Sequence, residues 1–141
     1  MPTTGEPTAA DTSVAVAALD AGHAVHAICR SAVLGHRPAL AGHAAFETHS
    51  VLTRMPGQLA VDAPSAAEII RRLFPRLLWL DDDQAAALLA RCGPLGIAGG
   101  AVYDALVGEA ARVHDAVLLT RDQRARRTYD LLGVTYELVG P

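Results

Sequence analysis

Apolar residues fall into two kinds of segment along the chain. Short continuous apolar runs predict strands, and stretches with apolar residues three and four positions apart predict helices. The predicted strands are a weak one ending at Asp11 and the ranges 38–42, 76–80, 115–120 and 134–139. The predicted helices are the ranges 14–35, 43–57, 64–73, 85–91, 99–114 and 123–133. Because strands alternate with helices and no hairpin signal occurs, we expect an α/β fold whose mainly parallel central sheet is flanked by helices.

Residue types that favour helix ends mark several of these boundaries. Ser13 and the threonine before it are capping types, and the helix that they introduce is expected to end near Gly35. Ser65 and Asp81 are each followed three residues later by Glu or Gln, the capping-box pattern at a helix start. We expect the Gly-Pro pair at 93–94 to close the helix that Asp81 opens.

The length of 141 residues suits one domain, with residues 1–7 as a flexible lead-in and residues 8–141 as the folded part. No apolar run is long enough to span a membrane, and the first ten residues lack the order of a secretory signal. Cys29 and Cys92 belong to no CxxC pair and are expected to be buried, reduced thiols. These features predict a cytoplasmic protein with no membrane segment.

Charge and composition exclude several kinds of function. The net charge is −3, so the whole molecule is not a strongly basic nucleic-acid binder. All 12 basic residues are arginines, because the sequence contains no lysine. A Walker A phosphate loop and a Schiff-base mechanism both require lysine, and both are therefore excluded.

Acidic residues recur where predicted strands lead into helices. Asp11 and Asp122 directly follow predicted strands, and Glu47 lies in the helix after another strand, at the margin of that helix's apolar stripe. Asp104 lies early in the helix that begins at the Gly-Gly pair of residues 99–100. Carboxyl ends of parallel strands meet at one edge of the sheet, so we expect the four carboxylates to converge there.

Carboxylates brought together in a partly dry cleft repel one another and raise one another's pKa values. A bound cation would relieve this repulsion. Oxygen ligands without organised His or Cys favour Mg²⁺ or Mn²⁺ over zinc, and these ions usually act on phosphate esters.

The ordered segments DTSVAVAAL, FETHSVLTRMPG, GIAGGAVYDALV and AVLLTRDQRA resemble the four acidic motifs of PIN-domain ribonucleases, and more narrowly those of VapC-type toxins. The resemblance covers nearly the whole chain from about residue 8. It departs from the family in the first strand, where EPTAAD contains a proline and little apolar bulk, so this strand is expected to be short or irregular.

The resemblance implies that Asp11, Glu47, Asp104 and Asp122 surround an Mg²⁺ or Mn²⁺ ion in a single PIN-like domain. It implies that Ser13 and Thr120 are accessory hydroxyls. The implied activity is metal-dependent hydrolysis of RNA phosphodiester bonds, and the general base stays open among the four acids. The implied partners are an RNA substrate, a second copy of the chain in a homodimer, and a VapB antitoxin whose tail lies across the catalytic groove.

Simpler interpretations of the acidic residues stay open. Glu47 could pair with Arg54 on its own helix, and Asp11 and Asp122 could be helix caps. The acidic run 81–83 is better explained by a helix N-terminus than by a cation site. His23 and His26, three residues apart, have no partners at spacings that would make a zinc site.

The densest positive cluster adjoins Asp122 and includes Arg121, Arg124, Arg126 and Arg127. It could be a solvated helix face or could contact RNA phosphates, and Arg121 and Arg124 are our candidates for RNA binding. Trp79 and the tyrosines are too scattered for a base-stacking platform and are expected in the core or an interface. The apolar helices at 65–74 and 84–92 are candidates for a dimer interface.

Two functions compete with the nuclease. A catalytically inactive PIN-fold module that binds RNA or protein would have the same fold. The absence of one of the four acids would favour this alternative, but all four are present. A phosphoacceptor receiver domain is also α/β with an acidic Mg²⁺ pocket. That family needs a lysine near its phosphorylated Asp, which this chain lacks.

Overall fold

The computed structural model describes residues 5–57 and 60–140. Its central sheet has five strands, all parallel, in the order β3-β2-β1-β4-β5. The strands are β1 (Thr8–Ala10), β2 (Ala39–Ala41), β3 (Leu77–Leu78), β4 (Val117–Thr120) and β5 (Tyr136–Leu138). The helices are α1 (Thr12–Leu19), α2 (His26–His36), α3 (Gly42–Thr53), α4 (Ala63–Leu73), α5 (Asp82–Leu95), α6 (Ala101–Val113) and α7 (Arg126–Leu132). The predicted α/β fold with a parallel sheet is confirmed.

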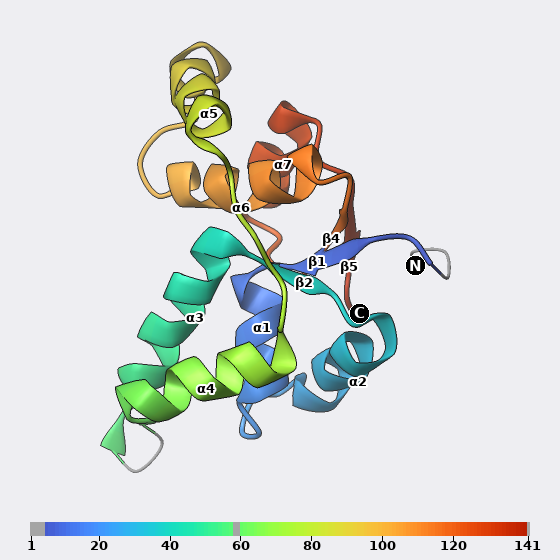
Figure 1. The fold of residues 1–141 in the computed structure, drawn as a ribbon, viewed down its shortest axis with the longest axis vertical. Coiled ribbons are helices and arrows are strands. Elements are labelled where there is room, and N and C mark those ends of the chain that lie inside the picture. Colours follow the sequence, from blue (N-terminus) through green and yellow to red (C-terminus); the bar gives the residue numbers. More distant parts are fainter. Residues whose placement is uncertain (1–4, 58–59, 141) are drawn as a thin grey trace.

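Helices cover both faces of the sheet. Helices α1 to α4 lie on one side of it, and α6 and α7 lie on the other, with α5 projecting beyond α6 (Figure 1). This arrangement follows from the strand order, because the chain steps outward from β1 to β3 and then crosses back to β4 and β5. With right-handed crossovers, a reversal of direction moves the connecting helices to the opposite face.

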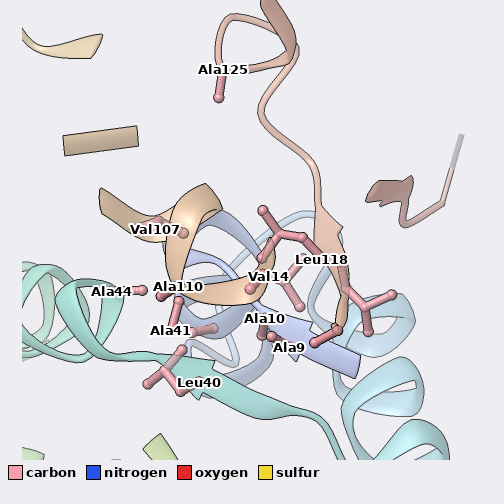
Figure 2. Close-up of a cluster of buried hydrophobic side chains, with 14 of the residues drawn as sticks. Ala9, Ala10, Val14, Leu40, Ala41, Ala44, Val107, Ala110, Leu118 and Ala125 are labelled. Carbon is pink, nitrogen blue, oxygen red and sulfur yellow. The ribbon is translucent and has the colours of Figure 1, made fainter. Parts of the chain in front are cut away.

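The first strand lies at the centre of the sheet although it is only three residues long. It pairs with β2 on one side and β4 on the other, and the N–H of Asp11 extends the ladder by donating to the carbonyl of Leu119 at 3.1 Å. Ala9 and Ala10 are fully buried, and their small side chains allow helices to approach the strand closely (Figure 2). The expectation of a short first strand is confirmed, and its shortness does not displace Asp11.

The start of the first helix differs from the prediction. Asp11, not Thr12 or Ser13, is the N-cap of α1, and its Oδ1 accepts from the N–H of Val14 at 3.2 Å. The predicted single helix up to Gly35 is also interrupted, because α1 ends at Leu19 and α2 begins at His26. A turn containing Gly22 separates them, and this glycine weakens the helix in the segment that the apolar pattern ran through.

The predicted caps of the next helices are partly correct. Asp62 is the N-cap of α4 and accepts from the N–H of Ser65 at 2.9 Å, so Ser65 is not the cap. The capping box of Asp81 at the start of α5 is confirmed. The end predicted at residues 93–94 is wrong, since α5 continues to Leu95 and ends at Gly96, whose φ of 72° lies in the left-handed region.

Other properties expected from the composition agree with the structure. Cys29 and Cys92 are both buried and free. In the part of the chain that the structure describes, no helix is long and apolar enough to cross a membrane. Residues 1–4 of the predicted lead-in lie outside the described residues, and residues 5–7 are exposed and precede β1.

Candidate active site

The acidic side chains singled out in the sequence line one cavity of about 540 Å³. Asp11 follows the central strand β1, Asp122 follows β4, Glu47 lies in α3, and Asp104 lies in the first turn of α6. Because β1 stands between β2 and β4, the segments that leave these three strands bring their acids to the same edge of the sheet. The expected convergence of the four carboxylates is therefore observed.

Asp11 forms the floor of this cavity and is only 3% exposed. Its Oδ1 accepts from the Ser13 hydroxyl at 2.6 Å and from the Val14 N–H, and its Oδ2 accepts from the hydroxyls of Thr120 and Tyr129. Burial raises the pKa of Asp11, and these hydrogen bonds oppose that rise. A carboxylate with several donors has a fixed orientation, so Asp11 is a preorganised group.

The hydroxyls of Ser13 and Thr120 connect Asp11 to the loop after β4. Thr120 donates to Asp11 and accepts from the N–H of Asp122 at 3.0 Å, while the Ser13 hydroxyl accepts from the N–H of Arg121 at 2.8 Å. Each hydroxyl thus donates to one acid and accepts from the backbone beside another. Both hydroxyls therefore bridge Asp11 and the backbone at residues 121–122, and their accessory role stays a prediction.

Glu47 is held by a residue at the start of α1 and not by its own helix. The hydroxyl of Thr12 donates to its Oε1 at 2.9 Å. Among the ion pairs of the described residues, none joins Glu47 to Arg54, whose side chain is exposed at the end of α3. The intrahelical pairing that would have explained Glu47 structurally is therefore not formed.

Asp104 has the clearest electrostatic signature in the cavity. Burial, followed by the charges of Asp122, Glu47 and Asp11, raises its pKa to about 6, and Arg124 opposes this rise. Burial is the largest cause of this shift, and the three neighbouring carboxylates add to it, so the cavity disfavours a further negative charge. A cation placed among these groups would meet a favourable potential.

Asp122 and Arg124 belong to the turn between β4 and α7. The Oδ1 of Asp122 accepts from the N–H groups of Arg124 at 2.9 Å and Ala125 at 3.3 Å. Helix α7 begins at Arg126 and has Ala125 as its N-cap, so Asp122 stabilises the preceding turn and is not itself the cap. Arg124 lies at the cavity with its side chain 94% exposed and its Nε 3.7 Å from Asp122.

Arg121 is directed elsewhere. Its Nη1 donates to the carbonyl of Val139 at 2.5 Å, beside β5. The guanidinium therefore already has an acceptor in the protein, whereas that of Arg124 lies at the cavity mouth. Farther along, Arg126 approaches the hydroxyl of Tyr136 at 3.3 Å on the surface of α7. These three arginines thus have different environments, and of the three Arg124 lines the acidic cavity.

Tyr129 is a site residue that the sequence analysis missed. It lies in α7, is 1% exposed, and its hydroxyl donates to Asp11 Oδ2 at 3.0 Å. Burial and the nearby charges of Asp11 and Asp104 raise its pKa, so it is a neutral donor at physiological pH. The available signal was a tyrosine on the apolar face of a helix next to the acidic motif, since a buried tyrosine hydroxyl requires a polar partner.

The donor set fits a hard divalent cation, since it consists of carboxylate oxygens. Within residues 5–57 and 60–140, no three acidic, His or Cys side chains have the arrangement of a completed metal site. Glu47 Oε1 accepts from one hydroxyl and keeps lone pairs for a cation, whereas both oxygens of Asp11 already accept two hydrogen bonds each, so a cation bound to Asp11 would replace one of those donors. The chemistry of the cavity is thus compatible with a cation.

The other candidate metal ligands have local roles. Asp81 caps α5, as a helix N-terminus predicts. His23 Nδ1 accepts from the N–H of Val25 at 3.3 Å, and His26 Nδ1 lies 2.8 Å from the carbonyl of Ala17. These bonds account for both histidines without zinc.

Comparisons with known proteins agree with the geometry. The family model described as PIN domain matches residues 9–131. Ribonuclease VapC27 of Mycobacterium tuberculosis strain H37Rv is 43% identical over 128 residues, covering 91% of this chain and 93% of that protein. Ribonuclease VapC40 of Mycobacterium tuberculosis strain CDC 1551 is 42% identical over 133 residues, covering 93% of this chain and 98% of that protein. The chain therefore belongs to the PIN-domain family, in its VapC branch.

Proposed function

We propose that this protein is a metal-dependent endoribonuclease toxin that hydrolyses RNA phosphodiester bonds. The observation that carries the proposal is the convergence of Asp11, Glu47, Asp104 and Asp122 on one cavity, where burial and the neighbouring carboxylates raise the pKa of Asp104 to about 6. Supporting it are the family match and two relatives named as ribonucleases, each matched over nearly its whole length.

The proposed cofactor is Mg²⁺ or Mn²⁺, held by the four carboxylates. PIN-domain ribonucleases generally use divalent metal ions, and a carboxylate donor set favours these two. When bound, such an ion would polarise the scissile phosphate and lower the pKa of an attacking water. The chain itself supplies the orientation of the acids: Ser13, Thr120 and Tyr129 hold Asp11, and Thr12 holds Glu47.

Arg124 is the proposed contact for an RNA phosphate. Its exposed guanidinium adjoins the acids, where it can offset their repulsion of a polyanionic substrate. For Arg121 the RNA-binding role stays a weaker candidate, because its guanidinium donates to Val139. We propose instead that Arg121 holds the loop after β4 against β5, which positions Asp122 and Arg124.

The proposed partners follow from the family. VapC proteins pair with VapB antitoxins, and we propose a VapB-type antitoxin that neutralises this chain by covering the cavity. We also propose a homodimer, supported by exposed Leu89 on α5 and Ile69 on α4, which are 72% and 38% exposed. We propose residues 8–141 as the nuclease domain and the cytoplasm as its location, which suits two free, buried cysteines.

The experiment that tests the function is cleavage of total cellular RNA by purified protein in Mg²⁺, Mn²⁺ or EDTA. We expect fragments in either metal, none in EDTA, and none from Asp104→Asn. The matched control is Asp82→Asn, an exposed acid on α5 away from the cavity, which should cleave normally. RNA binding without metal-dependent cleavage would instead support the catalytically inactive module.

A further inference from the structure

Two aromatic rings pack together on the helices that carry Glu47 and Asp104. His43 of α3 and Tyr103 of α6 are stacked, with ring centroids 5.2 Å apart and planes inclined by 10°. His43 precedes Glu47 by four residues on α3, and Tyr103 directly precedes Asp104 on α6. Side chains four apart on a helix lie on the same face, so the His43 ring adjoins Glu47, while Tyr103 is the sequence neighbour of Asp104.

The stacked pair presents an open aromatic surface. Tyr103 is 52% exposed although His43 covers one side of its ring. A tyrosine ring that is half open to water keeps a flat apolar surface available for contact with a ligand. Here the stack with His43 fixes the plane of the ring, so its surface is preorganised.

The position of this ring relative to Arg124 is set by the strand order. His43 lies on the helix after β2, and Arg124 lies in the turn after β4, with β1 and Asp11 between them. The acids are thus flanked by an aromatic surface on the β2 side and a cation on the β4 side. Nucleic-acid single strands need both kinds of contact, a cation for the phosphate and a flat ring for the base.

We propose that the His43–Tyr103 pair is a nucleobase subsite, in which an unstacked base of the RNA packs on the open surface of Tyr103. This inference rests on the proposed ribonuclease function and adds where the substrate base binds. It also implies a single-stranded substrate, because a base must leave its helix to stack on a protein ring. Since every base has a flat face, the subsite is expected to tolerate different bases.

The test is equilibrium binding of labelled single-stranded oligoadenylate in Mg²⁺, measured by fluorescence anisotropy. All variants carry Asp104→Asn so that the RNA is not cut. Tyr103→Leu should weaken binding about tenfold, the typical loss for one base stack, and Tyr103→Phe should stay within about twofold. His43→Leu, which removes the ring behind Tyr103, should have an intermediate effect.

Two controls separate stacking from a structural effect. Phe46→Leu removes a ring that is 66% exposed on the same helix and packs on Trp79, and it should not change binding. A chain of abasic ribose phosphates of equal length keeps the charges and lacks the bases, so Tyr103→Leu should not weaken its binding.

The proposal is overturned if Tyr103→Leu binds oligoadenylate normally, if Phe46→Leu loses as much affinity, or if the loss is equal on the abasic chain. Cleavage of cellular RNA by the chain with Asp104 intact keeps the two claims apart. Metal-dependent cleavage with any of those binding results overturns the subsite alone. Absence of cleavage overturns the proposed nuclease function, and the binding results then decide the subsite separately.

Discussion

The hydroxyl of Tyr129 donates to Asp11 Oδ2 at 3.0 Å, across 118 residues of sequence. The bond joins the last helix to the central strand, and both residues are almost fully buried. It connects the packing of α7 to the orientation of a proposed catalytic acid. Fold stability and site geometry therefore depend on the same atom.

Tyr129→Phe removes this donor and keeps the ring. We expect the free energy of unfolding to fall by about 1–2 kcal/mol, as for other hydrogen bonds to charged groups. We expect kcat for RNA cleavage to fall roughly tenfold or more, because Asp11 loses part of its alignment, while RNA affinity changes little. Denaturant unfolding and initial cleavage rates measure the two effects.

Tyr136→Phe is the matched control for this change. Tyr136 packs on Tyr129 with ring centroids 5.7 Å apart, but its hydroxyl donates to Asp130 on the surface. It should keep the activity of the unchanged protein. Equal losses in both variants would assign the effect of Tyr129→Phe to helix packing, contrary to our expectation.

The raised pKa of Asp104 predicts how the metal-free protein responds to pH. The group titrates near 3.8 in the unfolded chain and at about 6 in the folded one. Between these pH values the folded chain binds more protons, so this group's contribution to stability is lost as pH rises. Asp104→Asn should therefore raise the free energy of unfolding at neutral pH by about 1 kcal/mol, because the group is half-buried. This corresponds to a rise in Tm of roughly 3 °C.

This gain should disappear near pH 4, where Asp104 is protonated in both states. Thermal scans in EDTA at several pH values measure it. A Tm gain that stays constant across the pH range, or a loss at neutral pH, would contradict the electrostatic account of the cavity.

Glu47 and Arg54 offer a direct comparison of two explanations for one carboxylate. Glu47→Gln keeps the shape of the side chain and removes its charge, and we expect cleavage to fall on the order of a hundredfold if Glu47 helps to hold the metal. Arg54→Ala should leave activity and Tm nearly unchanged, because no ion pair joins these two described residues. Normal cleavage by Glu47→Gln would remove Glu47 from the proposed metal ligands.

Arg121 and Arg124 are expected to differ. Arg124→Ala should weaken RNA binding and lower the slope of log affinity against log salt by about one unit, as loss of one phosphate contact predicts. Arg121→Ala should mainly lower the Tm, since it removes the donor to Val139. A salt slope reduced by Arg121→Ala and unaffected by Arg124→Ala would reverse this ranking.

The parts of the structure that local patterns encode were predictable. Apolar runs located four of the strands, a weaker signal before Asp11 indicated β1, and the alternation of strands with helices indicated a parallel sheet, so the edge at which Asp11 and Asp122 meet followed from general rules. Helical periodicity singled out Glu47 at the margin of an apolar stripe, and the family resemblance then assigned it to the metal.

Tertiary contacts were not predictable from the same patterns. Nothing near Tyr129 in sequence indicates that its hydroxyl reaches Asp11, and the stack of His43 on Tyr103 joins helices 60 residues apart. The tyrosines were too dispersed along the chain to suggest a stacking surface, although folding leaves the ring of Tyr103 half exposed on the helix that carries Asp104. The N-caps of α1 and α4 were mispredicted for a related reason. Asp11 and Asp62 lie close to hydroxyl residues of similar capping propensity, and the local pattern does not distinguish between them.

The central claim is that Asp11, Glu47, Asp104 and Asp122 together hold a divalent cation. The most direct measurement is calorimetric titration of metal-free protein with Mn²⁺, in the unchanged chain, in Asp104→Asn and in Asp82→Asn. We predict saturable binding that is strongly weakened by Asp104→Asn and unaffected by Asp82→Asn. Binding that survives Asp104→Asn, or is lost on changing Asp82 in the acidic run of α5, would contradict the account.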